Sequence, residues 1–228
     1  MKEATKIFTL ISLCVLLAPV AARAQYGSLY GWQNRGYFRF DGGGVVTSST
    51  EVTEIFGPVP AGTRVEFDPG PRFGFNFGYN VTDWFAPELE FGWNANNVSS
   101  ITGAYVDGTF YEVPILVNVK FQLPNRTPFV PYAGIGGGGS GSILYLDHLD
   151  YGPLHVYGTE SDFQWAWQAF GGLRVNFNHR MALGVEYRYF RSGAPSFGED
   201  HSYYFGSSRI SFGEIESHII SLQFDLTF

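Results

Sequence analysis

The carboxyl-terminal stretch 217–228, SHIISLQFDLTF, alternates in character from one residue to the next. One parity carries the apolar residues Ile220, Leu222, Phe224, Leu226 and Phe228. Successive side chains of a β-strand point to opposite faces, so the stretch predicts a strand with one apolar and one mostly polar face. A soluble sheet can show this pattern in a single strand, and its recurrence along the chain is what restricts the fold.

The alternation recurs in seven earlier segments. The eight predicted strands cover residues 36–46, 71–80, 85–93, 111–121, 128–139, 163–177, 181–190 and 217–228. Short connections rich in turn formers lie at 80–83, 123–127 and 178–180. Long polar connections, which we expect to be loops, lie at 47–68, 94–109, 143–161 and 192–213. The parity of the fifth strand is ambiguous because it runs into glycines.

Eight such strands predict an all-β fold, an eight-stranded antiparallel up-and-down transmembrane β-barrel over residues 35–228. A tilted strand crosses the hydrocarbon core with about 9–11 residues, and a closed barrel leaves no unpaired edge in lipid. Because long and short connections alternate, the short ones and both ends of the barrel share one side. A soluble lipocalin-like barrel is the alternative, with its apolar face inward, but its polar face should carry more charge than this one does.

Aromatic residues lie at both ends of the predicted apolar stripes and predict the two interfacial girdles of a membrane barrel. Those near the short connections are Tyr79, Phe85, Phe121, Phe177 and Phe228. Those toward the long connections are Trp93, Trp165, Trp167 and Tyr189.

The amino terminus has the layout of a secretory signal peptide: a charged start, a short apolar run at 7–20, and an A-x-A motif at Ala22 and Ala24. We expect a signal peptide at 1–24 with cleavage after Ala24, and a short periplasmic leader at 25–34. The mature chain would keep 204 of the 228 residues.

The cysteine content argues against disulfide bonds, and the charge argues against a nucleic-acid partner. Cys14, the one cysteine, lies in the predicted signal peptide, so no disulfide is expected in the mature chain. The first 24 residues carry three basic residues and one acidic residue, so the formal charge changes from −7 to −9 on cleavage. This acidic balance argues against a nucleic-acid partner.

Three further features carry a resemblance: PYAGIGGG at 131–138, the hairpin from GLRVNF to MALGVEYRYF at 172–190, and the terminal Phe228. With the A-x-A motif, they make residues 35–228 similar to the small eight-stranded OmpA/OmpX-like and opacity-porin-type barrels of Gram-negative outer membranes. The resemblance implies outer-membrane localisation, and Phe228 as part of the signal that the barrel-assembly machinery reads. Activities in this family range from structural to adhesive to pore-forming, so the resemblance implies no single function.

Ionisable residues on the inward parity form the main candidate site. They are Arg39, Asp41, Arg72, Glu88, Glu90, Glu112, Lys120, Arg174, Glu186, Arg188 and Asp225. An eight-stranded barrel is only wide enough for its own side chains, and buried charges must pair or cost several kcal/mol each. We therefore expect a salt-bridged plug; the alternative is a gated pore in which these pairs exchange partners.

Other motifs predict no catalytic, cofactor or metal site. The glycines at 134–139 match G-x-G-x-x-G, but no helix is expected after them, so a dinucleotide site is not predicted. The polar residues Asp147, His148, Asp150 and His155 match no defined metal loop and are expected to be solvated.

No convergent nucleophile and base are apparent either. Ser217 and Ser221 are expected to face inward whereas His218 faces outward. His179 and His201, in connections, are expected to be solvated.

The sequence therefore predicts a monomeric, non-enzymatic outer-membrane barrel, surrounded by lipid, with an envelope structural or surface-interaction role. An extracellular ligand would bind the long loops, and Tyr203, Tyr204 and Phe205 are the best candidate contact surface. The alternative is a small porin-like channel for ions or small solutes. A lipid-modifying barrel enzyme is a third, weaker hypothesis.

Overall fold

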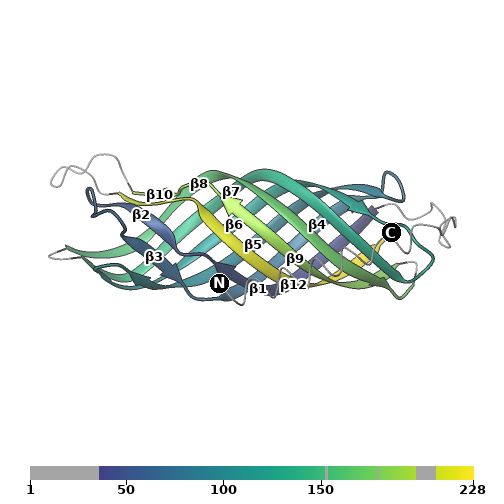
Figure 1. Ribbon diagram of the computed structural model, residues 1–228, viewed down its shortest axis with the longest axis horizontal. Helices are drawn as coiled ribbons and strands as arrows, with labels where there is room; N and C mark the ends of the chain where they lie inside the picture. Colours follow the sequence, from purple (N-terminus) through teal and green to yellow (C-terminus); the bar gives the residue numbers. More distant parts are fainter. Residues whose placement is uncertain (1–35, 152–153, 179, 199–208) are drawn as a thin grey trace.

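The computed structural model describes residues 36–151, 154–178, 180–198 and 209–228, and all of its regular structure is β (Figure 1). The strands are β1 (Gly36–Thr47), β2 (Thr50–Ile55), β3 (Arg64–Phe67), β4 (Gly70–Tyr79), β5 (Phe85–Ile101), β6 (Tyr105–Gln122), β7 (Phe129–Tyr151), β8 (Leu154–Asn176), β9 (Met181–Ser192), β10 (Ser196–Phe197), β11 (Ile210–Phe212) and β12 (Ile215–Thr227). No helix long and apolar enough to cross a membrane occurs among the described residues.

Eight of these strands close into an antiparallel ring in the order β1, β4, β5, β6, β7, β8, β9, β12. The ring closes between β1 and β12, whose ladder runs from Tyr37 opposite Thr227 to Thr47 opposite Ser217. Closure pairs the backbone of every strand on both sides, which lipid requires. The predicted eight-stranded antiparallel barrel is confirmed.

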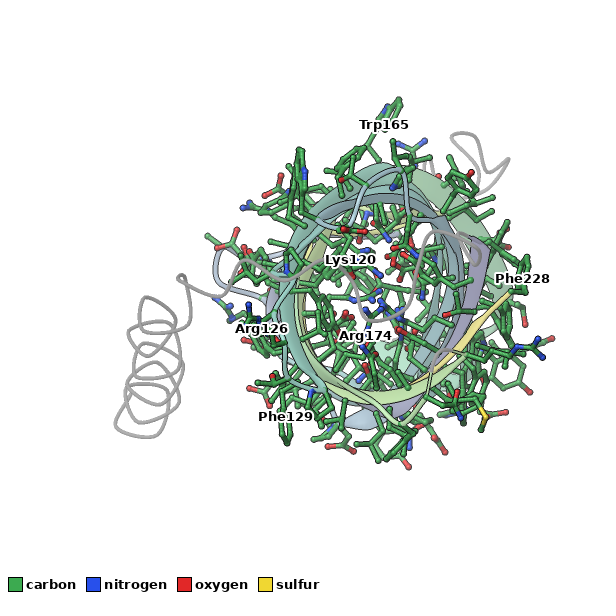
Figure 2. The ribbon with its side chains drawn as sticks, turned by 90° about the vertical axis from the view of Figure 1, so that its right-hand side faces the viewer. Lys120, Arg126, Phe129, Trp165, Arg174 and Phe228 are labelled. Atoms are coloured by element: carbon green, nitrogen blue, oxygen red, sulfur yellow. The ribbon has the colours of Figure 1, made fainter. Side chains whose placement is uncertain are left out.

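The alternation of side chains across the barrel wall also follows the prediction. On β4, Phe73, Phe75 and Phe77 are between 44% and 51% exposed on the outer face, while Arg72 and Asn76 are fully buried. Lys120 and Arg174 point into the lumen, whereas Phe129, Trp165 and Phe228 point outward (Figure 2). The ambiguous parity of β7 resolves with Val130 and Tyr132 inward.

Aromatic rings form two belts on the outer surface. At the end that carries the short connections, here called the turn end, Trp84 and Phe85 pack on Phe121, with ring centroids 6.1 and 5.5 Å apart. Toward the opposite, far end, Trp93 contacts Tyr111 at 5.8 Å and Trp167 contacts Tyr189 at 5.4 Å. Trp84 and Tyr111 were not among the predicted girdle residues, and both extend the belts around the barrel.

The prediction of four long polar loops is wrong. Residues 94–101 and 105–109 continue β5 and β6 to a tight turn, and residues 143–151 and 154–161 continue β7 and β8. The connections 47–68 and 192–213 contain β2 with β3 and β10 with β11. Residues 94–101 and 143–150 alternate too, but their aliphatic residues, such as Val98 and Leu144, face inward, so a search for outward apolar stripes misses them.

These added strands build a second β-structure, here called the cuff, at the far end of the barrel (Figure 1, left). β3 pairs with β5, β2 with β3, β11 with β2, and β10 with β11. No ladder joins β10 to β8 in the described residues. This seam is bridged by the Ser196 backbone N–H, which donates to Asp162 Oδ2 at 2.7 Å, and by the Gly193 N–H, which donates to the Trp165 carbonyl at 2.9 Å.

The cuff encloses an apolar core, here called the cap. Its members are Val52, Ile55, Val65, Phe67, Val98, Ile101, Phe110, Leu144, Leu146, Leu149, Phe197, Ile210, Phe212 and Ile215. Four aromatic rings interlock at its centre; for example, Phe110 lies 6.4 Å from Phe212 in an edge-on contact. Exposed polar residues such as Glu51, Asn97 and Asp147 cover the outer face of the cuff.

Glycines of β7 let neighbouring strands approach closely. A Cβ at Gly138 would overlap the backbone carbonyl of Ile115 and approach Leu116, whereas a Cβ at Gly141 would meet no atom within 4 Å. Backbone atoms held in a ladder on both sides cannot move aside to make room.

We predict that Gly138→Ala destabilises the barrel by about 1–3 kcal/mol, the usual cost of forcing extra atoms into a packed site. Gly141→Ala on the same strand is the matched control and should leave stability unchanged. Urea unfolding of the refolded proteins, followed by the heat-dependent gel shift of the folded band, measures both. Equal midpoints for the two variants would contradict the steric account.

Candidate functional site in the barrel lumen

The structure places all eleven predicted interior charges in the lumen. Ten of them are at most 3% exposed, and Arg174, near the turn end, has a side chain that is 15% exposed. They come from the inward parity of β1, β4, β5, β6, β8, β9 and β12. Arginine, lysine and carboxylate side chains from strands distant in sequence thus meet in one narrow interior.

Ten of the eleven charges form one connected ion-pair network. Arg72 Nη2 lies 2.6 Å from Glu90 Oε1 and its Nε lies 3.3 Å from Asp41 Oδ2. Glu90 also pairs with Arg188, whose Nη2 lies 2.6 Å from Glu186 Oε1. Glu90 is therefore shared by two guanidinium groups and links the halves of the network.

Arg39 connects the remaining members toward the turn end. Its Nε lies 2.7 Å from Asp225 Oδ1, and its Nη1 lies 3.5 Å from Glu88 and 3.7 Å from Glu186. The network ends at Lys120, whose Nζ is 2.6 Å from Glu88 Oε1, and at Arg174, whose Nη1 is 3.3 Å from Asp225 Oδ2.

Neutral side chains complete this network. Asn118 Nδ2 and Gln168 Nε2 donate to Glu90 Oε2 at 2.7 and 2.6 Å. Tyr37 donates its hydroxyl to Glu88, and its ring centroid lies 4.1 Å from Lys120 Nζ, a cation–π contact. Tyr132 Oη lies 3.0 Å from Glu186 Oε2. These two aromatics were absent from the predicted site, although the inward parity of Tyr37 beside Arg39 pointed to the first of them.

Beyond the network the lumen is filled in layers, as the order of inward residues along β1, β6, β8, β9 and β12 shows. Next toward the far end is an apolar layer of Val45, Leu116, Ala166, Phe190 and Ile219. Then comes a layer here called the hydroxyl layer, with Thr47, Asn94, Asn96, Glu112, Ser140, Ser142, Gln164, Ser192 and Ser217. The cap closes the stack.

Glu112 is the member of the predicted charge set that the network does not include. Its Oε1 accepts a hydrogen bond from Ser192 Oγ at 2.8 Å. Among the described residues, no cationic group lies within 4.0 Å of its carboxylate, and its Oε2 has no hydrogen-bond partner.

The other candidate residues do not assemble into a site. Ser217 and Ser221 are buried in the lumen while His218 is exposed on the outer face, where its Nδ1 lies 2.7 Å from Tyr187 Oη. His148 pairs with Asp150 at 3.0 Å. A hydrogen bond from Tyr145 to the Asp147 carboxylate raises the pKa of that tyrosine. No group of three or more potential metal ligands occurs within the described part of the chain.

Several predicted features lie outside the described residues: the signal peptide with Ala22 and Ala24, the leader, His179, His201, and the loop aromatics Tyr203, Tyr204 and Phe205. The same holds for the side chain of His155. Phe228 is described: it lies 68% exposed at the turn end, and its backbone N–H donates to the Gly36 carbonyl at 2.8 Å.

Comparison with known proteins shows what this chain is similar to. A family model described as "Outer membrane protein beta-barrel domain" matches residues 8–228. No curated protein sequence matches the chain. The solved structure of OprG from Pseudomonas aeruginosa is similar with a TM-score of 0.54 at 14% identity, covering 85% of this chain and 97% of OprG.

Two further solved structures resemble the chain. Neisserial surface protein A gives a TM-score of 0.51 at 14% identity, with 85% and 97% of the two chains covered. The outer membrane protease OmpT from Escherichia coli gives 0.52 at 9% identity, with 90% and 99% covered. Identities this low show a common fold and carry no activity from one protein to another.

We predict that Glu90→Gln destabilises the folded barrel by about 3–5 kcal/mol, because it leaves Arg72 and Arg188 short of their shared counter-charge in a buried site. Glu51→Gln, on the exposed face of β2, is the control and should stay within about 0.5 kcal/mol of the wild type. Urea midpoints in detergent micelles measure both changes. A wild-type midpoint for Glu90→Gln would show that the network contributes little to stability.

Proposed function

The chain belongs to the outer membrane protein β-barrel domain family, and from this premise we propose that it is a closed, non-enzymatic barrel that anchors its cuff at the cell surface. The observation that carries the proposal is the continuous filling of the lumen by the ion-pair network, the apolar layer, the hydroxyl layer and the cap. The ion-pair network and the hydroxyl layer are charged or polar, whereas the apolar layer and the cap are apolar. An ion would have to cross the two apolar barriers and an apolar solute the two polar ones, so neither has a favourable path through the lumen. The protein resides in the outer membrane with its apolar outer face in lipid.

The cuff supports a structural or surface-interaction role. Its strands are paired and cored by the cap, so it presents a rigid, polar outer surface rather than flexible loops. We propose that an extracellular ligand would bind this surface. We further propose a monomer, because the spanning strands of one chain close the ring and leave no strand edge for a partner.

A gated small-solute channel is the second candidate, favoured by one observation. Arg39 lies within 4 Å of three carboxylates, so its ion pairs could exchange without leaving any charge unpaired. Opening would also require the apolar layer and the cap to move apart. An enzymatic role has less support, because the inward serines and the outward His218 lie on opposite faces of the wall.

We predict that the refolded wild type shows no steady conductance in planar bilayers. Arg188→Ala alone should also stay closed, because Phe190 in the apolar layer and Phe110 in the cap still block the lumen. The triple variant Arg188→Ala, Phe190→Ala, Phe110→Ala should conduct, and the outward Tyr189→Ala is the control. Each sample is first shown to be folded by its heat-dependent gel shift. Steady conductance of the wild type would favour the channel.

For Phe228 we propose a role in assembly through the barrel-assembly machinery. Phe228→Ala should reduce the amount of protein assembled in the outer membrane of cells several-fold, with no loss of stability once the protein is refolded in vesicles. Phe177→Ala is the matched control, an aromatic at the same end that is 61% exposed against 68% for Phe228. If both variants assemble equally poorly, the aromatic belt and not the chain terminus is what assembly requires.

A further inference from the structure

The lumen carries one more carboxylate than cationic side chains, and this excess negative charge lies at a single residue. Five cationic side chains meet five carboxylates in the ion-pair network, and each of these ten groups has an opposite charge within 4.0 Å. Glu112, the sixth carboxylate, is 1% exposed and has no such partner among the described residues. A buried, unpaired carboxylate is costly, so a positive charge that neutralises it would stabilise the fold.

The network cannot supply that charge. The apolar layer, with Leu116 and Phe190, lies between Glu112 and most of the network along β6 and β9. Arg72 is the nearest cation by ladder register, since it lies opposite Asn94, which lies opposite Glu112. Its guanidinium is already bound to Asp41 and Glu90, and it donates from Nη1 to Asn94 Oδ1 at 3.1 Å.

The groups around Glu112 are oxygen-rich and incompletely bonded. Glu112 lies opposite Ser142 in the β6–β7 ladder, and Ser140 lies opposite Gln164 in the next. Two buried oxygens in this layer, Glu112 Oε2 and Ser140 Oγ, have no hydrogen-bond partner, whereas the side-chain amides of Asn94 and Gln164 lie against the carboxylates of Glu112 and Asp162. Buried polar atoms are rarely left unpaired, so an unpaired carboxylate oxygen and an unpaired hydroxyl in one layer point to a bound species.

We propose that the hydroxyl layer binds one hydrated alkali-metal cation at Glu112. Hard cations take carboxylate and hydroxyl oxygens, which Glu112, Ser140 and Ser192 supply, and water completes the coordination shell. The hydroxyl layer carries one unbalanced negative charge, so one monovalent cation restores neutrality. A divalent ion would leave an excess charge between two apolar layers.

The entry route for the cation would lie beside the site. The β8–β9 ladder ends at Ala166 opposite Ser192, directly below the seam between β8 and β10. Gln164 and Ser192, both in the hydroxyl layer, flank this point, and Asp162 lies at the seam with its carboxylate bound to two backbone N–H groups. An acidic, ladder-free seam gives a small cation access that an intact barrel wall would not.

The test is the thermal unfolding midpoint of the refolded mature chain in NaCl, KCl and N-methyl-D-glucamine chloride at equal ionic strength. We expect the wild-type midpoint to rise with the concentration of Na⁺ or K⁺, because an ion that binds only the folded state stabilises it by mass action. Glu112→Gln should lose this dependence and, in N-methyl-D-glucamine, exceed the wild type. The exposed Glu51→Gln should keep the wild-type response.

Two results would overturn the proposal. One is a wild-type midpoint that is the same in all three salts. The other is a wild-type midpoint that rises on acidification but does not respond to Na⁺ or K⁺, while the midpoint of Glu112→Gln responds to neither. That result would mean that a proton neutralises Glu112. If Glu112→Gln fails to fold, Ser140→Ala should show the response shifted to higher cation concentration. The outcome is independent of the proposed closed barrel, which conductance tests.

Discussion

The width of an eight-stranded ring is the constraint on which the rest of this structure depends. Lipid on the outside forces the polar parity of every strand into a lumen that holds little more than its own side chains. Charges placed there cannot be hydrated by bulk water, so they must neutralise one another across the lumen. The linked pairs from Asp41 through Glu90 and Arg39 to Arg174 follow from this, and so does the polar support of Glu90 by Asn118 and Gln168.

A few residues farther toward the far end, the polarity of the inner and outer faces of the barrel wall is reversed. On β6 the inward residues change from Lys120 and Asn118 near the turn end to Phe110 in the cap. The outer face changes in the reverse sense, from Val117 to the polar Asp107. The long strands β5, β6 and β7 are apolar toward lipid and polar toward the lumen, then apolar toward the cap and mostly polar toward water. The position of this inversion marks where the protein leaves the membrane.

This inversion explains how much of the fold could be read from the sequence. The alternation in 71–80 and 217–228 was long and aromatic, so the ring, its parity and the interior charges followed from it. Residues 94–109 and 143–150 alternate as well, but most of their outward residues are polar, and a search for apolar outward stripes assigns them to loops. Phe110, Leu144 and Leu146 were the usable signal, because three large apolar residues on the inward parity require a core.

The sequence predicted which residues make up the candidate site, but it did not predict how those residues are arranged. Parity alone placed eleven ionisable groups inside, but Arg39 and Asp225 are 186 positions apart and meet only because the ring closes between β1 and β12. A count of five cations and six carboxylates could not say which carboxylate lacks a partner. The layering and the pairing decide it together: an apolar layer lies between Glu112 and Arg188, and Arg72, the nearest cation, is held by Asp41 and Glu90. Net charge in a barrel lumen must therefore be balanced locally, because packed apolar side chains keep the more distant charged groups from making contact with it.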